Sequence, residues 1–121
     1  MAYDNNNIFA KILREEIPCK KIYEDDFVLS FYDINPQKKI HALVIPKGKY
    51  IDLDDFAINA SNDEIVGLIK GINIVAKKLN ISVDTGKGYR ALANISEYGG
   101  QEVPHLHFHL FGGEKVGKMV Q

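Results

Sequence analysis

Three of the four histidines in this 121-residue chain stand at alternate positions near its C-terminal end, namely His105, His107 and His109. Side chains two residues apart in a β-strand lie on the same face, about 6.6–6.8 Å from each other. If residues 104–111 form a strand, the three imidazoles project from one side of it. The apolar residues between them then project from the other side, into a core.

A row of imidazoles limits the protonation states that its members can hold. Neighbouring positive charges lower each other's affinity for protons, so at least one ring is expected to stay neutral near pH 7. A neutral imidazole can act as a nucleophile, a base or a metal ligand. The spacing alone leaves three interpretations open: a ladder of surface or half-buried structural histidines, a metal site, for which His-x-His on a strand is a known ligand arrangement, or histidine-based phosphoryl chemistry.

The residues just before this row favour phosphate over a bare cation. Gly99 and Gly100 form a pair whose backbone amides can approach an anion closely, although such a pair also occurs in ordinary turns. No carboxylate lies inside the row to serve as a hard ligand or to orient a metal-bound histidine, and the nearest one is Glu102. The fourth histidine, His41, alternates with apolar residues in IHALVIP, and by itself it would be interpreted as a satisfied core residue.

The rest of the chain predicts an α+β domain with an antiparallel five-stranded sheet, one long helix and one short helix. The clearest element is a helix over 62–79, because Ser61 and Glu64 fit a capping box and apolar residues follow the 3.6-residue period. No repeat or linker divides the chain, so residues 1–121 are expected to form a single domain. The other expected elements are a short helix between Ile8 and Pro18, a hairpin turning at Asp25–Asp26, strands at 40–46, 88–95 and 104–111, and loops at 47–55, with a helix near its end, and 96–103.

Two glycines inside the long helix, Gly67 and Gly71, are four residues apart and share one face. Each costs about 1 kcal/mol relative to alanine in a helix. We therefore expect this face to be a close-packing surface, against a strand or against a partner helix. A membrane-helix contact is disfavoured, because Lys70 and the charged flanks would lie in lipid.

Composition excludes several other classes of protein. The 15 basic and 16 acidic residues give a net charge of −1, so no general attraction to nucleic acid or to an anionic membrane is expected. No apolar run reaches the ~18 residues needed to span a bilayer, and the first residues lack the pattern of a signal peptide. The single cysteine, Cys19, has no partner for a disulfide, which is typical of a reduced, cytoplasmic protein.

The sequence closely resembles the histidine triad (HIT) superfamily. HLHFHLFGG resembles the family signature, and four further segments resemble the Hint branch in order and spacing: NIFAKILREEIP, YEDDFVLSFYDINPQ, HALVIPK and GYRALAN. The resemblance extends from about residue 7 to residue 113. The Hint branch comprises nucleoside phosphoramidate and adenylyl-lysine hydrolases, which are homodimers.

This resemblance implies a mechanism without a metal or other cofactor. His107 would attack the α-phosphorus of a purine nucleotide conjugate and form a nucleotidyl-histidine intermediate that water cleaves. His105 and His109 would position and polarise the phosphate oxygens, His109 would help the leaving group take a proton, and His41 would pack behind the row. The positions implied for nucleotide binding are Asp33 and Ile34 at the ribose, Phe9 and Phe31 at the base, Asn94 near the phosphate, and Gly100, Gln101 and Glu102 in the phosphate loop.

Two departures from the branch bear on the site, and the first of them bears on the leaving group. Glu102 stands where many members have serine, and a carboxylate repels phosphate unless it is protonated or turned away. The C-terminal EKVGKMVQ differs from the longer, tryptophan-containing tail of animal relatives. The cysteine pair that binds zinc in some bacterial relatives is missing from NIFAKI, so no structural zinc is expected.

The leading hypothesis is therefore hydrolysis of purine nucleoside phosphoramidates or AMP–lysine-type conjugates by a homodimer. The Gly67/Gly71 face is one possible part of the dimer interface. The alternatives are a dinucleoside polyphosphate hydrolase, a nucleotide-binding scaffold whose catalysis is incidental, and a protein that binds metal on the histidine face.

Overall fold

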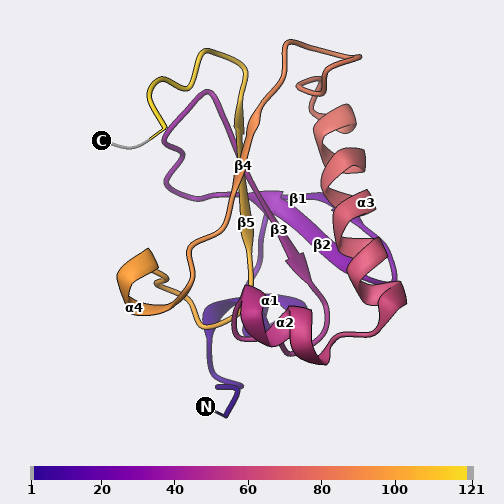
Figure 1. Ribbon diagram of the computed structural model, residues 1–121, viewed down its shortest axis with the longest axis vertical. Helices are drawn as coiled ribbons and strands as arrows, with labels where there is room; N and C mark the ends of the chain where they lie inside the picture. The colour runs from indigo at the N-terminus through magenta and orange to yellow at the C-terminus, as the bar shows by residue number, and fades with distance from the viewer. Residues whose placement is uncertain (1, 120–121) are drawn as a thin grey trace.

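Five antiparallel strands form one sheet, in the order β1-β2-β3-β5-β4. The structure is a computed structural model that describes residues 2–119. The α+β class and the five-stranded sheet agree with the prediction (Figure 1). The strands are β1 (Lys21–Glu24), β2 (Val28–Tyr32), β3 (Ile40–Pro46), β4 (Arg90–Leu92) and β5 (Phe108–Gly112).

Among residues 2–119 four helices accompany the sheet, where the sequence predicts one long helix, one short helix and a helix near the end of 47–55. They are α1 (Ile8–Leu13), α2 (Leu53–Asn59), α3 (Asn62–Lys78) and α4 (Ser96–Gly99). The α4 helix lies in the segment expected to be a loop, and it ends where Gly100 adopts the left-handed conformation, with φ of 75°. A glycine in this conformation is a common helix terminator. No helix among residues 2–119 has the length and apolar character that a bilayer crossing requires.

The long helix α3 packs on the sheet through its two glycines. Its first turn has the predicted capping box between Ser61 and Glu64. A Cβ atom placed on Gly71 would lie 2.8 Å from Val28 Cγ2, and one placed on Gly67 would lie 2.5 Å from the Phe27 ring. The glycine face therefore packs against a strand of the same chain. Because this face is filled from within, it is not available as the partner-helix surface.

Apolar clusters cover both faces of the sheet. On the α3 side lie Val28, Ala42, Val44, Phe56, Leu68, Ile72, Val75, Leu106 and Leu110. On the α1 side lie Phe9, Ile12, Leu29, Phe31, Leu43 and Ile45. The strand β3 serves both clusters, since successive side chains of a strand point to opposite faces. Both faces of the sheet are therefore covered by apolar side chains, and α3 runs beside β1 and β2 (Figure 1).

The last two strands are shorter than the sequence predicts. Arg90–Leu92 replaces the expected 88–95, and β5 begins only at Phe108, so His105 and His107 precede the strand. The backbone before Phe108 bonds to loops instead of a neighbouring strand: His105 N–H donates to Val103 O and Leu106 N–H to Tyr50 O. The alternation nevertheless persists, because Leu106 and Leu110 lie in the α3-side core while the histidines face away from it.

Candidate active site

The orientation of His105 is fixed by two hydrogen bonds. Its Nε2 lies 2.8 Å from Pro46 O, and its Nδ1 lies 2.6 Å from the Tyr3 hydroxyl. A carbonyl oxygen can only accept, so Nε2 carries the proton and Nδ1 accepts from Tyr3. Burial raises the pKa of Tyr3, which keeps this hydroxyl protonated. His105 is fully buried and is held as one neutral tautomer.

The same reasoning fixes the tautomer of His107. Its Nδ1 lies 2.7 Å from the backbone oxygen of His105, so Nδ1 carries the proton and donates it. The Nε2 atom of the neutral ring therefore keeps a free lone pair. The edge-on contact with the Phe9 ring, with centroids 4.9 Å apart, holds the imidazole in place. His107 thus has the electronic form that a nucleophile needs.

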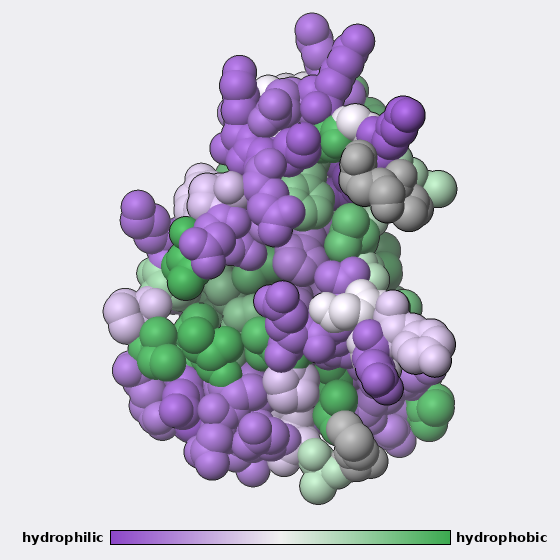
Figure 2. Space-filling model, turned by 90° about the vertical axis from the view of Figure 1, so that its left-hand side faces the viewer, coloured by the Kyte–Doolittle hydropathy of each residue, from purple (hydrophilic) through white to green (hydrophobic). Residues whose placement is uncertain are grey.

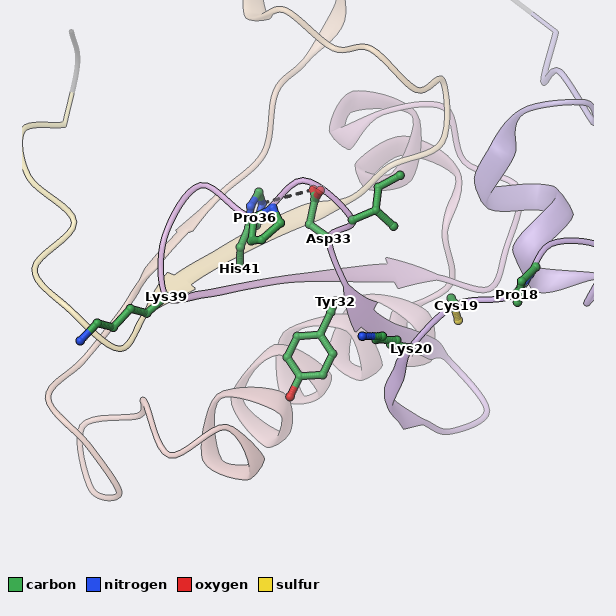
Figure 3. Close-up of a pocket in the computed structure, with 9 residues that line it drawn as sticks. Pro18, Cys19, Lys20, Tyr32, Asp33, Pro36, Lys39 and His41 are labelled. Carbon is green, nitrogen blue, oxygen red and sulfur yellow. Dashed lines mark ion pairs between the residues drawn. The ribbon is translucent and has the colours of Figure 1, made fainter.

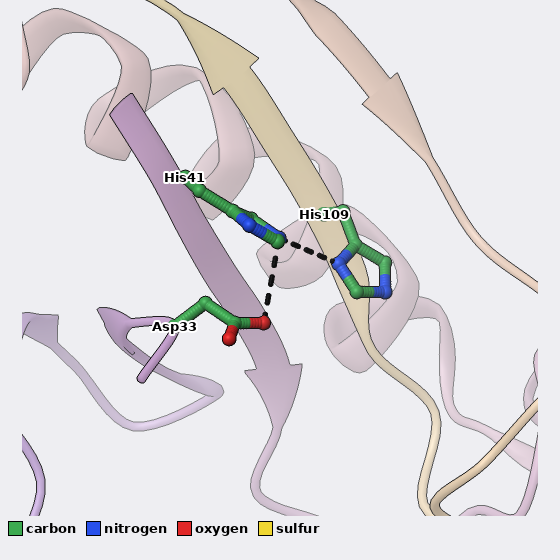
Figure 4. A group of neighbouring side chains, drawn as sticks. All are labelled: Asp33, His41 and His109. Atoms are coloured by element: carbon green, nitrogen blue, oxygen red, sulfur yellow. Dashed lines mark hydrogen bonds and ion pairs between the residues drawn. The ribbon is translucent and has the colours of Figure 1, made fainter. Parts of the chain in front are cut away.

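The other two histidines form a pair that joins β3 to β5 (Figure 4). The backbone N–H of Gln37 donates to His41 Nδ1 at 3.2 Å, so the proton of neutral His41 resides on Nε2. That Nε2 lies 2.9 Å from His109 Nδ1 and 3.4 Å from the Asp33 carboxylate. His109 Nδ1 therefore accepts, and its Nε2–H is left as a donor.

Burial favours the neutral form of all four rings. The pKa of His105 and of His109 is lowered to about 4, mainly by burial, and at His109 the neighbouring His107 and His41 contribute to this lowering. Burial also lowers the pKa of His41 and of His107. The Asp33 carboxylate opposes this effect on the pKa of His41, His107 and His109. The His107 ring is consequently neutral at physiological pH.

A cavity of about 180 Å³ lies beside the histidines and gathers residues from distant parts of the chain. Seven of them are positions predicted from the sequence. The cavity is lined by Phe9, Asp33, Gln37, Leu43, Asn94, Gly100, Glu102, Val103, His107 and His109. The tertiary structure thus brings four segments to one point: α1, β5, the loop that follows β2, and the loop that contains Gly100 and Glu102.

A second hollow of about 770 Å³ begins at Asp33 and His41 (Figure 3). It runs to Pro18 and Cys19 beside α1 and includes Ile34, which is 86% exposed. Asp33 is therefore shared between this hollow and the cavity beside the histidines. Burial raises the pKa of the Cys19 thiol, in keeping with an unreactive, reduced cysteine.

Two predicted site residues lie behind the cavity. Phe31 is 4% exposed and packs edge-on against Phe9, with ring centroids 5.6 Å apart, so it supports the cavity wall. Gln101 braces the glycine loop, because its amide donates to Ile51 O and Val103 O while its Oε1 accepts from Ser96 N–H.

Sequence reasoning missed Tyr3 and Gln37. Tyr3 gives no local signal, because it is 102 positions away from His105. Gln37 follows the Asn35–Pro36 turn, which returns the chain to the start of the next strand. This turn is the sequence signal that could have placed the Gln37 amide near His41.

A cation could approach one group of side chains in this site. Asp33, His41 and His109 each offer a ligand atom, and these atoms lie within 4.8 Å of one another. Two of the atoms, however, already share the hydrogen bond between the histidines. A cation bound through these two atoms would have to replace that hydrogen bond, so without a cation the two ring nitrogens already satisfy each other.

The fold and the site define a class of small α+β proteins in which linked imidazoles lie beside a small cavity. The chain belongs to the HIT family: the HIT domain matches residues 14–116. An uncharacterized HIT-like protein of Azospirillum brasilense is 51% identical over 118 residues, which are 98% of this chain and 94% of that protein.

Solved structures agree with this assignment. A HIT family hydrolase from Clostridium thermocellum has a TM-score of 0.84 and 38% identity, covering 98% of this chain and 99% of that one. A histidine triad protein from Clostridium difficile has the same TM-score and identity, covering 98% and 100%. These structures have the same five-stranded architecture as this chain.

Proposed function

We propose that this protein is a hydrolase of the Hint type that releases AMP from purine nucleoside phosphoramidates or AMP–lysine-type conjugates. The observation that carries the proposal is the free Nε2 lone pair of His107, which follows from the Nδ1–H bond to the His105 carbonyl. The name of the C. thermocellum structure, a HIT family hydrolase, supports the reaction class. Transfer of a nucleotidyl group to an imidazole nitrogen requires a neutral ring with that nitrogen unprotonated beside a cavity for the phosphate, and His107 meets this requirement.

In the first step, His107 Nε2 attacks the α-phosphorus and the bond from phosphorus to the leaving nitrogen breaks. The substrate phosphate and Asp33 both favour one additional proton on the His41–His109 pair. This proton occupies His41 Nδ1, which gives up its 3.2 Å contact with the Gln37 amide. His109 Nε2 then donates its own proton to the leaving nitrogen, which departs as an amine with the bonding electron pair, and the His41 Nε2 proton shifts along the hydrogen bond to His109 Nδ1. The pair returns to neutral, and the nucleotidyl-His107 ring carries a positive charge that its Nδ1–H shares with the His105 carbonyl.

In the second step, water attacks the phosphorus. Its oxygen forms the new bond to phosphorus, its proton passes to His109 Nε2, and the electrons of the phosphorus–nitrogen bond return to His107. AMP leaves, His107 is neutral again, and the extra proton is back on the histidine pair. No metal or external base is needed to balance either step.

The surrounding residues suit a nucleoside on the α1 side of the cavity. Asp33, shared by the cavity and the larger hollow, is suited to accept hydrogen bonds from ribose hydroxyls, and Ile34 extends along the same hollow. Phe9, supported by Phe31, offers a flat wall whose size favours a purine. Asn94 and Gly100 lie where they can contact phosphate oxygens.

The test compares wild type with His107→Ala on adenosine 5′-phosphoramidate. We expect turnover by the wild type and a loss of roughly three orders of magnitude or more in the variant. A variant slowed at hydrolysis, His109→Ala, should accumulate an AMP-sized mass adduct on His107. Lys87→Ala, in an exposed loop, serves as the control and should match the wild type. Equal rates for His107→Ala and wild type would reject the proposal, as would an absolute requirement for stoichiometric zinc or copper.

A further inference from the structure

A basic pocket lies next to the catalytic cavity. This pocket, of about 510 Å³, shares Gln37, Asn94 and His109 with the catalytic cavity. Its other lining residues are Lys38, Arg90, Leu92, Phe111, Val116, Lys118 and Met119. We propose that the pocket binds the leaving group, and that the preferred leaving group carries a negative charge. This inference rests on the proposed hydrolase function and specifies its substrate class.

The pocket holds three cationic side chains and no acidic one: Lys38, Arg90 and Lys118 come from the loop before β3, from β4 and from the C-terminal tail. Within residues 2–119, none of the three forms an ion pair. The acidic residues of this region lie elsewhere, Asp33 and Glu102 on the catalytic cavity and Glu114 on the backbone amide of Lys39. The positive charge is therefore available to a ligand.

Arg90 also fixes the shape of the pocket. Its guanidinium donates to the backbone oxygens of Gly117 at 2.8 Å and Lys118 at 3.2 Å. These carbonyl acceptors are neutral, so the positive charge of the guanidinium stays uncompensated. The same two hydrogen bonds hold the C-terminal tail against the pocket. The predicted difference in the C-terminal tail thus has a structural consequence, because the tail brings Lys118 and Met119 to this site; Val120 and Gln121 lie outside the described residues. The face that carries the tail is largely hydrophilic in its upper half (Figure 2).

The position of His109 assigns this pocket to the leaving group. Displacement at phosphorus runs roughly in line, so the leaving atom departs on the side opposite to His107. His109, the proton donor, lines both the catalytic cavity and the basic pocket, so this residue lies at the boundary between them. The larger hollow is lined by the Asp33 carboxylate, which suits ribose hydroxyls, and also by Lys20 and Lys39. The basic pocket differs from it in having no acidic side chain in its lining.

The ligand chemistry follows from these charges. An amine that bears a carboxylate or a phosphate as its only other charge gains attraction from three cations, whereas a lysine linked through its side chain brings a carboxylate and an ammonium that offset each other. A second positive charge on the amine would be repelled. The pocket therefore favours conjugates of AMP with acidic amines.

Matched conjugates test this inference. AMP phosphoramidates of β-alanine, 2-aminoethylphosphonate, β-alaninamide and 1,3-diaminopropane give a carboxylate, a phosphonate, a neutral and a cationic leaving group of similar size. We expect kcat/KM for the two acidic conjugates to exceed that for the neutral one by about tenfold, with the cationic one lowest. Whichever acidic conjugate reacts faster distinguishes carboxylate from phosphate as the preferred group.

Charge variants separate pocket recognition from differences in amine basicity. Lys38→Gln and Lys118→Gln should each lower kcat/KM for the acidic conjugates about threefold more than for the neutral one. Lys87→Gln, which removes an exposed lysine outside the pocket, should change no ratio. If the acidic and neutral conjugates respond equally to the two pocket variants, the inference is overturned while the hydrolase proposal stands.

Binding provides a readout that does not depend on turnover. The β-alanine and β-alaninamide conjugates are titrated into His107→Ala, and we expect a dissociation constant about tenfold lower for the acid at low salt, with the difference shrinking as salt is added. Equal dissociation constants would overturn the inference. If no conjugate is cleaved by the wild type and no adduct forms on His107, the proposed function itself fails, whatever the binding result.

Discussion

At the residue scale, three backbone groups determine where the ring protons of the site lie. The carbonyls of Pro46 and His105 each require an N–H, and the amide of Gln37 requires a lone pair. These constraints leave His107 Nε2 as an acceptor and His109 Nε2 as a donor. Four chemically identical side chains thus acquire different roles from the hydrogen bonds behind them, as often occurs at catalytic histidines.

Tyr3 has a measurable role in this arrangement. In Tyr3→Phe, His105 Nδ1 loses its donor while the ring stays buried, so the free energy of unfolding should fall by about 1–3 kcal/mol. Urea denaturation at pH 7.5 measures the change. The control is Tyr98→Phe, since Tyr98 is fully exposed and should show no change. Equal stability of Tyr3→Phe and wild type would mean that this hydrogen bond is not formed.

At the element scale, close contact between α3 and β2 decides how the helix sits on the sheet. Gly71 is buried and Val28 is fully buried beneath it, so the two backbones approach more closely than a side chain would allow. The structure thus chooses between the two interpretations that the glycine spacing left open, a strand or a partner helix.

Replacing Gly71 by alanine should destabilise the protein, despite the higher helix propensity of alanine. The new Cβ would lie 2.8 Å from Val28 Cγ2, and overpacking of this kind typically costs about 1–3 kcal/mol. The propensity gain offsets about 1 kcal/mol of this cost. Asn73→Ala, at an exposed position of the same helix, is the control and should be neutral or stabilising. A Gly71→Ala variant as stable as Asn73→Ala in chemical denaturation would show that the helix can shift freely.

At the scale of the whole molecule, the buried neutral histidines link stability to pH. The pKa of His105 is about 4 in the folded protein against an ordinary value of 6.5. The unfolded chain therefore binds more protons between these values, so stability is complete above pH 6.5 and is lost as the pH falls toward 4. His105 alone contributes a loss of about 3 kcal/mol across this window.

Denaturation of the ligand-free protein at pH 7.5, 6 and 5 measures this dependence. The free energy of unfolding should decrease at each step, and His109→Gln should reduce the slope, because the pKa of His109 is also lowered to about 4. Nucleotide and phosphate must be absent, since bound anions would favour protonated histidines. A stability that is flat from pH 7.5 to 5 would contradict the buried neutral state of these rings.

The open edge of the sheet supports the predicted homodimer, which we retain as a proposal. Among residues 2–119, β4 pairs only with β5, and Ala91 at its centre is exposed. An unpaired edge of this kind can be covered by the same edge of a second copy. Sedimentation equilibrium should give twice the chain mass of 13.6 kDa. The variant Ala91→Pro should shift the mass toward the monomer, and a monomeric wild type would reject the proposal.

The sequence by itself determined the fold class, the long helix and the common face of the three histidines. Each of these features depends on hydrophobic periodicity or helix capping among residues that are close in the sequence, so it can be predicted without knowing the tertiary structure. Even where β5 proved shorter than predicted, Leu106 and Leu110 kept their side of the chain because burial enforces the alternation.

Only the tertiary structure decided which imidazole nitrogen carries a proton, that Tyr3 lies on His105, and that Lys38, Arg90 and Lys118 meet in one pocket. Hydrogen-bond partners and clusters of charge depend on where distant segments of the chain cross. The local periodicity of the sequence does not indicate which distant segments meet. Their positions are determined by how the helices and loops pack on the two faces of the sheet.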